Sequence, residues 1–211
     1  MLIPYRAEVF VDQEPRANYV LIFAMILAFF ITWIMPGEWI RYFLLSDTTI
    51  LPGILTYLFL HADLIHLIGN VIFLWTFGNA VNCRMGNFRY TLTFLGLGFI
   101  AGLLHILIDG NPVLGASGAI SGITGMFLFL FPRSEIRFFY FIIYHAGIAR
   151  LPSIILVLYW FFYDLLMYYL GSQGIAYVAH LSGYLAGFFG AWALLNLRMI
   201  SLWESDKPMI Y

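Results

Sequence analysis

The chain has 211 residues, of which 63% are hydrophobic and 19% aromatic, and it contains only 10 Lys plus Arg and 11 Asp plus Glu. About a quarter of the residues of a soluble domain are charged, so this composition excludes a water-exposed globule and indicates a polytopic membrane protein. A net charge of −1 without a long basic run excludes nucleic acid as a partner. The single cysteine, Cys83, excludes an intramolecular disulfide and a cysteine-based zinc site.

Six apolar segments predict membrane helices. A helix needs about 20 apolar residues to cross about 30 Å of hydrocarbon, and five uncharged runs approach this length: 18–35, 64–81, 90–108, 152–170 and 175–197. The sixth, 117–131, reaches only about 22 Å, so one of its ends must begin inside the membrane and be reached through the loop 109–115. The run 138–148, between Arg137 and Arg150, is too short to span, and we expect it at the membrane interface.

The basic residues predict the orientation. Only Arg41 falls on one side of these six spans, and nine basic residues fall on the other: Arg6, Arg16, Arg84, Arg89, Arg133, Arg137, Arg150, Arg198 and Lys207. The positive-inside rule then makes both termini cytoplasmic. The predicted organisation is a cytoplasmic segment 1–17, a six-helix domain 18–197 and a cytoplasmic tail 198–211, with the first span retained and not cleaved as a signal peptide. The sequence contains no internal repeat of the kind that would indicate an inverted-repeat transporter.

Four polar side chains share one depth in this topology. His66, Asn70, Ser117 and His180 all lie in the outer halves of their predicted spans, where each polar group is costly and needs a reason. His66 and Asn70 are four residues apart and share a helix face. Ser117 opens the short helix, where unpaired backbone N–H groups and the positive end of the helix dipole favour developing negative charge.

Small residues indicate how two of these helices meet. Glycines follow His180 at i+3 and i+7, and others recur along the short helix; such spacings let two membrane helices approach closely. The residues are Gly183 and Gly187 on the last span, and Gly118, Gly122 and Gly125 on the short one. This contact would bring Ser117 within reach of His180. A serine beside a histidine base, a helix N-terminus and neutral donors predicts an acyl-transfer site, and hence a serine hydrolase sunk in the membrane.

The same residues resemble the rhomboid family of intramembrane serine proteases. Gly-Ala-Ser-Gly at 115–118 resembles the family's Gly-x-Ser-Gly nucleophile motif, and residues 179–187 resemble its Ala-His-x-x-Gly-x-x-x-Gly element. The His66-x-x-x-Asn70 pattern is similar to its second-helix signature. Ile-Pro-Tyr-Arg at 3–6 and Phe-Pro-Arg at 131–133 also fit, so the resemblance covers nearly the whole chain.

The resemblance implies a set of roles. Ser117 would be the nucleophile and His180 its general base, without the acid of a triad. Asn70, His66 and the Ser117 backbone N–H would stabilise the oxyanion. Glycines would pack the helices around the site: Gly115, Gly118, Gly122, Gly183 and Gly187.

The resemblance also implies a fold and a setting. The fold would be an all-α, six-helix rhomboid-like bundle whose short, buried fourth helix carries the nucleophile. A water-filled cavity would open to the outer side, with lateral access near helices two and five and with no metal or cofactor. The substrate would be a single-span membrane protein cut near its outer end, in the plasma membrane. The sequence indicates no oligomeric state.

Asp164 is an intramembrane carboxylate, which suggests a function by default. It could snorkel, pair with backbone groups, or orient His180 as a third triad member. The last option is the least favoured because its helix is not required to face the dyad, so we expect Asp164→Asn to leave most activity intact. His61 is interpreted as structural, Ser121 and Ser182 as packing residues, and His105 and His145 as residues without a matching partner.

Other classes of protein are weighed against this interpretation. An aspartyl intramembrane protease needs two intramembrane Asp residues, and only Asp164 is present. A metalloprotease would need a ligand set such as His-Glu-x-x-His, which is absent. A small channel or transporter would need polar residues along the full depth of the membrane. A catalytically inactive rhomboid-like protein that binds membrane helices commonly lacks the serine or the histidine, and this chain keeps both.

Overall fold

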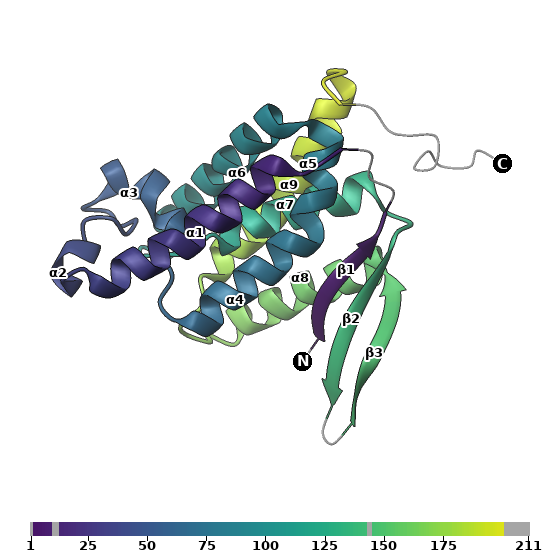
Figure 1. Cartoon of the computed structure of the whole chain (residues 1–211). Coiled ribbons are helices and arrows are strands. Elements are labelled where there is room, and N and C mark those ends of the chain that lie inside the picture. Colours follow the sequence, from purple (N-terminus) through teal and green to yellow (C-terminus); the bar gives the residue numbers. More distant parts are fainter. Residues whose placement is uncertain (1, 10–12, 143–144, 201–211) are drawn as a thin grey trace.

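The structure, a computed structural model, describes residues 2–9, 13–142 and 145–200 and is mostly helical (Figure 1). The long helices are α1 (Arg16–Ile34), α6 (Asn87–Ile108) and α9 (Tyr177–Asn196), together with a continuous run of α4 (Leu64–Phe73), the π-helical segment η2 (Leu74–Gly78) and α5 (Asn79–Met85). Two shorter apolar helices are α7 (Ser117–Leu130) and α8 (Ser153–Tyr169). The connection from α1 to α4 contains α2 (Gly37–Ile40), α3 (Ile50–Thr56) and η1 (Tyr57–Phe59).

Within the residues that the structure describes, four helices are long and apolar enough to cross a membrane: α1, the continuous α4–α5 run, α6 and α9. Large apolar side chains cover the outside of the bundle; on α8 they include the exposed Ile155, Tyr159 and Phe162. An exposed apolar surface of this extent would aggregate in water and matches a lipid environment. The chain is therefore a multi-pass membrane protein, and a helix lies at each of the six segments predicted from the sequence.

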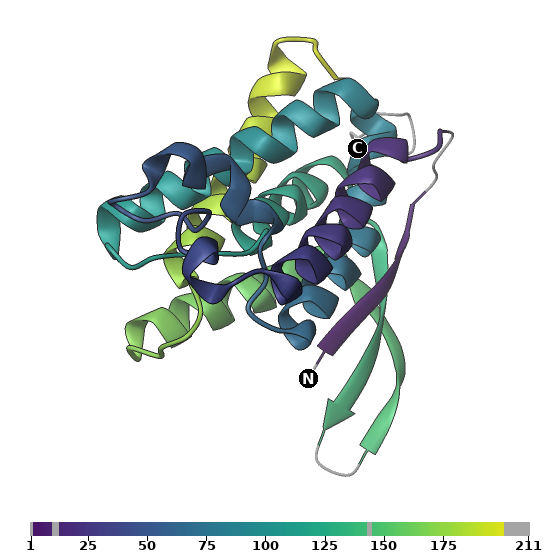
Figure 2. The ribbon, with the colours of Figure 1, turned by 60° about the vertical axis from the view of Figure 1, so that its left-hand side comes forward.

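The centre of the bundle is α7, of whose 14 residues 11 are buried. It lies against α9 and α6, and Figure 2 shows it enclosed by its neighbours. The contact with α9 is backbone on backbone: a Cβ on Gly183 would meet the Gly118 carbonyl, and one on Gly187 would meet that of Gly122. These glycines therefore let α9 approach α7 more closely than any larger side chain would allow.

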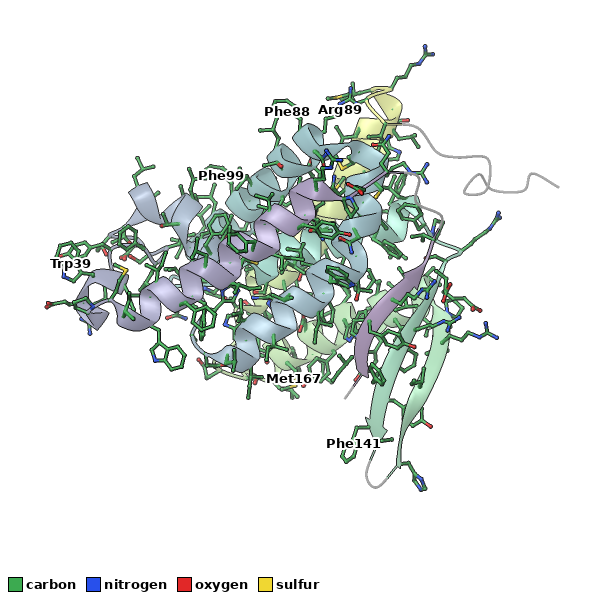
Figure 3. All side chains as sticks on the ribbon, in the orientation of Figure 1. Trp39, Phe88, Arg89, Phe99, Phe141 and Met167 are labelled. Carbon is green, nitrogen blue, oxygen red and sulfur yellow. The ribbon has the colours of Figure 1, made fainter. Side chains whose placement is uncertain are left out.

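A three-stranded antiparallel sheet shows that the all-α prediction was wrong. Its strands are β1 (Leu2–Glu8), β2 (Glu135–Ile142) and β3 (His145–Pro152), in the order β1-β2-β3, and it lies beside the bundle with β1 against α4 and η2 (Figure 1). Along β2, Ile136 and Phe138 are buried, whereas Arg137 and Phe139 are exposed. This is the period-2 pattern of a strand. The apolar residues on the outer face, such as Phe141 at the far end of the sheet in Figure 3, hid this alternation.

Buried amides tie α1 to the second helix. The Asn18 backbone N–H donates to Asn82 Oδ1 at 3.0 Å, and Asn18 Nδ2 donates to Leu74 O at 2.9 Å and to Asn79 Oδ1 at 2.8 Å. The Tyr90 hydroxyl donates to Asn18 Oδ1. Hydrogen bonds of this kind satisfy polar groups that neither water nor lipid can reach. This network lies at the opposite end of the bundle from the beginning of α4.

Candidate active site

A cavity of about 850 Å³ lies among helix ends: the N-terminal ends of α4, α7 and α9 and the C-terminal ends of α6 and α8. Its wall contains the four polar residues that the sequence places at one depth: His66, Asn70, Ser117 and His180. The three elements that carry them are far apart along the chain and come together at this cavity. The cavity therefore holds a hydroxyl, two imidazoles and an amide in a single polar compartment within an apolar bundle.

Ser117 is the first residue of α7 and is half-buried. No side chain caps this helix, so the N–H groups of its first turn face the cavity end without a side-chain acceptor. Gly115 turns the chain into the helix with φ +113°, a conformation that only glycine adopts readily, and its N–H donates to Tyr57 O at 2.8 Å. The turn thus fixes Ser117 at the positive end of a helix dipole.

The second helix covers this turn. A Cβ on Gly115 would come 2.7 Å from Cε1 and 2.8 Å from Nε2 of His66, and 3.8 Å from Asn70 Nδ2. Asn70 is only 6% exposed, and its Nδ2 has no hydrogen-bond partner within the described residues. A buried donor without a partner is costly unless something else uses it. An acceptor bound in the cavity beside Ser117 would satisfy it.

Asp164 of α8 pairs with His180. Of the three options that the sequence left open for this carboxylate, contact with His180 was the least favoured. Its Oδ2 is 3.0 Å from His180 Nδ1, and the two side chains are 13% and 17% exposed. A carboxylate can only accept, so the imidazole donates through Nδ1–H and keeps the lone pair of Nε2 free for another proton. Which way α8 turns about its own axis decides this contact, and the sequence of an apolar helix does not reveal that rotation.

The hydroxyl of Ser117 and the imidazole of His180 line the same cavity without a direct hydrogen bond between them in the described part of the chain. The backbone contact of Gly183 with Gly118 holds α9 against the first turn of α7, one residue after Ser117. Catalytic hydrogen bonds are often long before substrate binds and tighten in the complex.

Two residues of the cavity wall, His105 and Asp109, form a pair that was not predicted from the sequence. His105 Nδ1 lies 3.1 Å from Asp109 Oδ2 at the end of α6, which corrects the expectation that His105 has no partner. Their spacing of four residues was the signal for this pair in the sequence.

His61 packs edge-to-face on His66, with ring centroids 5.1 Å apart. Burial together with the charge of His66 lowers the pKa of His61 to about 4, although a hydrogen bond to Phe59 O opposes the shift.

Within residues 2–9, 13–142 and 145–200, no group of three or more His, Cys, Asp or Glu side chains could hold a metal ion. The arrangement can instead support chemistry by a hydroxyl, an imidazole and neutral donors. A nucleophile, a base held by a carboxylate, and donors for a developing negative charge are the parts of an acyl-transfer site.

The chain is similar in sequence to several rhomboid proteins. A family model described as "Rhomboid domain" matches residues 36–197. The chain is 31% identical over 133 residues to "Rhomboid protease GluP" of Bacillus subtilis, covering 59% of this chain and 26% of that protein. It is 28% identical over 193 residues to "Rhomboid protein 1, mitochondrial" of Saccharomyces cerevisiae, covering 82% and 52%. It is 26% identical over 172 residues to "Presenilin-associated rhomboid-like protein A, mitochondrial" of Danio rerio, covering 78% and 42%.

These relatives are longer proteins, and the chain spans about half of their length or less. Two of the three are named as mitochondrial proteins, so the comparisons do not support the plasma membrane predicted from the resemblance.

Proposed function

Since the chain belongs to the rhomboid family, we propose that it is an intramembrane serine endopeptidase that cleaves the membrane-spanning segments of single-span proteins. The observation that carries the proposal is the cavity shared by the Ser117 hydroxyl, the His180 imidazole and the unpartnered amide of Asn70. Each of these groups alone is compatible with helix packing. Together, beside a helix N-terminus, they match the needs of acyl transfer.

The proposed architecture is a six-helix domain over residues 18–197, in which α7 is the short fourth helix. At 14 residues it would cover about 21 Å, less than the hydrocarbon thickness, so its first residue would lie below the membrane surface. The basic residues favour both termini on the cytoplasmic side, with segments 1–17 and 198–211 outside the membrane domain. The cavity would then open to the opposite side, from which water could reach Ser117.

Acylation would begin with the Ser117 hydroxyl. As Oγ attacks the carbonyl carbon of the scissile bond, its proton passes to Nε2 of His180, and the carbonyl π electrons move onto oxygen. Asn70 Nδ2, His66 and the Ser117 backbone N–H would donate to that oxyanion. The intermediate collapses when the C–N bond breaks and His180 returns the proton to the leaving amine. Water, deprotonated by the same imidazole, then attacks the acyl carbon. The bond from that carbon to Ser117 Oγ breaks as His180 returns the proton to Oγ, which releases the acid and restores the serine.

The route of the substrate would lie between α4 and α8. On α8, Trp160 makes ring contacts with Phe73 of α4, at 4.8 Å between centroids, and with Phe77 of the adjoining η2, at 5.9 Å. Phe73 also lines the cavity. Side-chain contacts of this kind separate more easily than the backbone contact of α7 with α9, because rotamer changes suffice. A membrane helix could therefore reach Ser117 sideways from the lipid, as the resemblance implies.

Two other functions fit the observations less well. A channel or transporter needs a polar path through the membrane, whereas this cavity lies at one end of the bundle. Binding of membrane helices by an inactive protein does not require the Asn70 donor beside a serine, nor the hydrogen bond between Asp164 and His180. The test below separates both from a protease.

The test is cleavage of a single-span model substrate by the purified protein in proteoliposomes. The wild type is expected to produce two fragments, and Ser117→Ala and His180→Ala are expected to produce none while still binding the substrate. Ser121→Ala, which removes a hydroxyl one turn further along the same helix, serves as the matched control. Cleavage that survives Ser117→Ala, or a wild type that binds substrate without cutting it, would contradict the proposal.

A further inference from the structure

We propose that Asp164 completes a Ser117–His180–Asp164 triad, as a positioning residue that holds the imidazole in the tautomer able to take the serine proton. This inference rests on the function proposed above and concerns the same site. It starts from the hydrogen bond between Asp164 Oδ2 and His180 Nδ1, which are 3.0 Å apart. It departs from the dyad that the family resemblance implies.

The location of the pair favours a strong interaction. Asp164 comes from α8 and His180 from α9, 16 residues apart along the chain, so the contact is tertiary. Both side chains are largely shielded, at 13% and 17% exposed. His180 lines the cavity, whereas Asp164 is not among the described residues that line it, so the imidazole and not the carboxylate faces the cavity. A charged hydrogen bond in so little water is stronger than the same bond at a surface.

A carboxylate inside a membrane domain also needs an explanation of its own. A carboxylate within a membrane-spanning helix is costly, so such residues are kept for a partner or a function. The partner of Asp164 is an imidazole that lines the candidate active site, and a neutral packing residue at 164 would avoid this cost. The ion pairs of the described residues include no Lys or Arg on Asp164, so His180 is its cationic partner there once protonated.

The chemical role of Asp164 follows from the ring nitrogen of His180 that donates to it, which is Nδ1. Accepting from Nδ1–H fixes the neutral imidazole with its lone pair on Nε2, the nitrogen left to meet Ser117. When Nε2 takes the Ser117 proton, the ring becomes an imidazolium whose charge the neighbouring carboxylate stabilises, and Asp164 itself stays ionised. When the leaving amine takes the proton back, the ring returns to the same neutral tautomer. Other titratable groups interact electrostatically with the pair: His66 and His105 with His180, and Tyr184 with Asp164.

The test compares Asp164→Asn with the wild type in the cleavage assay. Asn has the same shape but can donate through its amide to Nδ1, which would move the proton of the neutral ring to Nε2. We expect kcat to fall by about 10²-fold or more with KM nearly unchanged, and labelling of Ser117 by a fluorophosphonate to slow in parallel. Asp164→Glu, which retains a carboxylate, is expected to recover part of the loss. Asp47→Asn makes the same change at an exposed site in the loop before α3 and is expected to leave both rates unchanged.

A structural readout separates positioning from folding. NMR of the histidine ring nitrogens is expected to show His180 protonated at Nδ1 in the wild type and the Nε2–H tautomer gaining population in Asp164→Asn. A kcat of Asp164→Asn within about threefold of an active wild type, or an unchanged tautomer, would overturn the triad and leave the protease proposal standing. If Asp164→Asn does not fold, Asp164→Glu becomes the readout. A Glu variant that folds but shows no cleavage above background would also count against the triad. A wild type that neither cleaves nor labels would overturn both.

Discussion

The contact between Gly183 and Gly118 makes a sharp prediction for Gly183→Ala. A methyl group at 183 would lie 3.2 Å from the carbonyl carbon of Gly118 and 3.2 Å from the backbone nitrogen of Gly122, and well inside contact distance of the Gly118 oxygen. These are backbone atoms, so no side chain can rotate away. The helices α7 and α9 would have to separate by roughly 1 Å to restore ordinary van der Waals contact.

The expected cost has two parts. Overpacking of this kind destabilises a fold by about 1 to 3 kcal/mol. The separation also moves Ser117, the residue before Gly118, relative to His180, and a misplacement of about 1 Å can cost about 10²-fold in rate. Gly183→Ala is therefore expected to lower the thermal midpoint and to lower kcat by about two orders of magnitude in the protein that remains folded.

The assay is substrate cleavage alongside thermal unfolding in detergent, with Gly190→Ala as the matched control. Gly190 lies on the same helix, and a Cβ there would meet nothing within 4 Å, so this variant is expected to keep wild-type stability and activity. Gly183→Ala with wild-type stability and rate would refute the close approach of α7 and α9. Equal losses in both variants would show that the effect does not come from this contact, because the higher helix propensity of Ala would by itself favour the folded helix.

Three further changes test other parts of the structure. Asn70→Ala is expected to lower kcat by about 10² to 10³-fold with little change in KM, which is the effect of removing one oxyanion donor. A rise in KM alone would instead make Asn70 a binding or structural residue. Asn18→Leu should lower the free energy of unfolding by about 2 to 4 kcal/mol, because it leaves buried partners such as Asn79 Oδ1 without their hydrogen bond. It should leave the cleavage rate per folded molecule unchanged. A denaturation midpoint that matches the wild type would contradict the hydrogen-bond network. The pKa of His61 is about 4 in the fold and 6.5 unfolded, so protonation favours the unfolded state, and stability should be lost as the pH falls from about 6.5 towards 4. His61→Gln should lose less stability over this window, and an equal loss in both proteins would assign the pH dependence to other groups.

The helices were predictable because length and hydropathy encode them directly. The segment expected at 117–131 is observed as Ser117–Leu130, and that at 90–108 as Asn87–Ile108. The glycine spacing also predicted the contact of α7 with α9, since small residues four apart on two helices leave few other ways to pack. From these elements alone, Ser117 and His180 could be expected on one cavity.

The sheet and the histidine–carboxylate pair could not be predicted in the same way. One partner of β2 is β1, more than 120 residues earlier in the chain, and no local pattern links these two strands. The pairing of Asp164 with His180 depends on how α8 rotates about its axis, and both the lipid-facing and the inward sides of that helix are aromatic and aliphatic, as Tyr163 and Leu156 illustrate. Rotation is set by packing against neighbours, which a single sequence does not display.

The most direct measurement is the mass-spectrometric location of a fluorophosphonate adduct on the purified wild-type protein. A hydroxyl activated by an imidazole reacts with such a probe, whereas an ordinary membrane serine does not. The adduct is expected on the peptide that contains Ser117, and it should disappear in Ser117→Ala and persist in Ser121→Ala. An adduct on another residue, or no adduct on a folded protein, would contradict the assignment of Ser117 as the nucleophile.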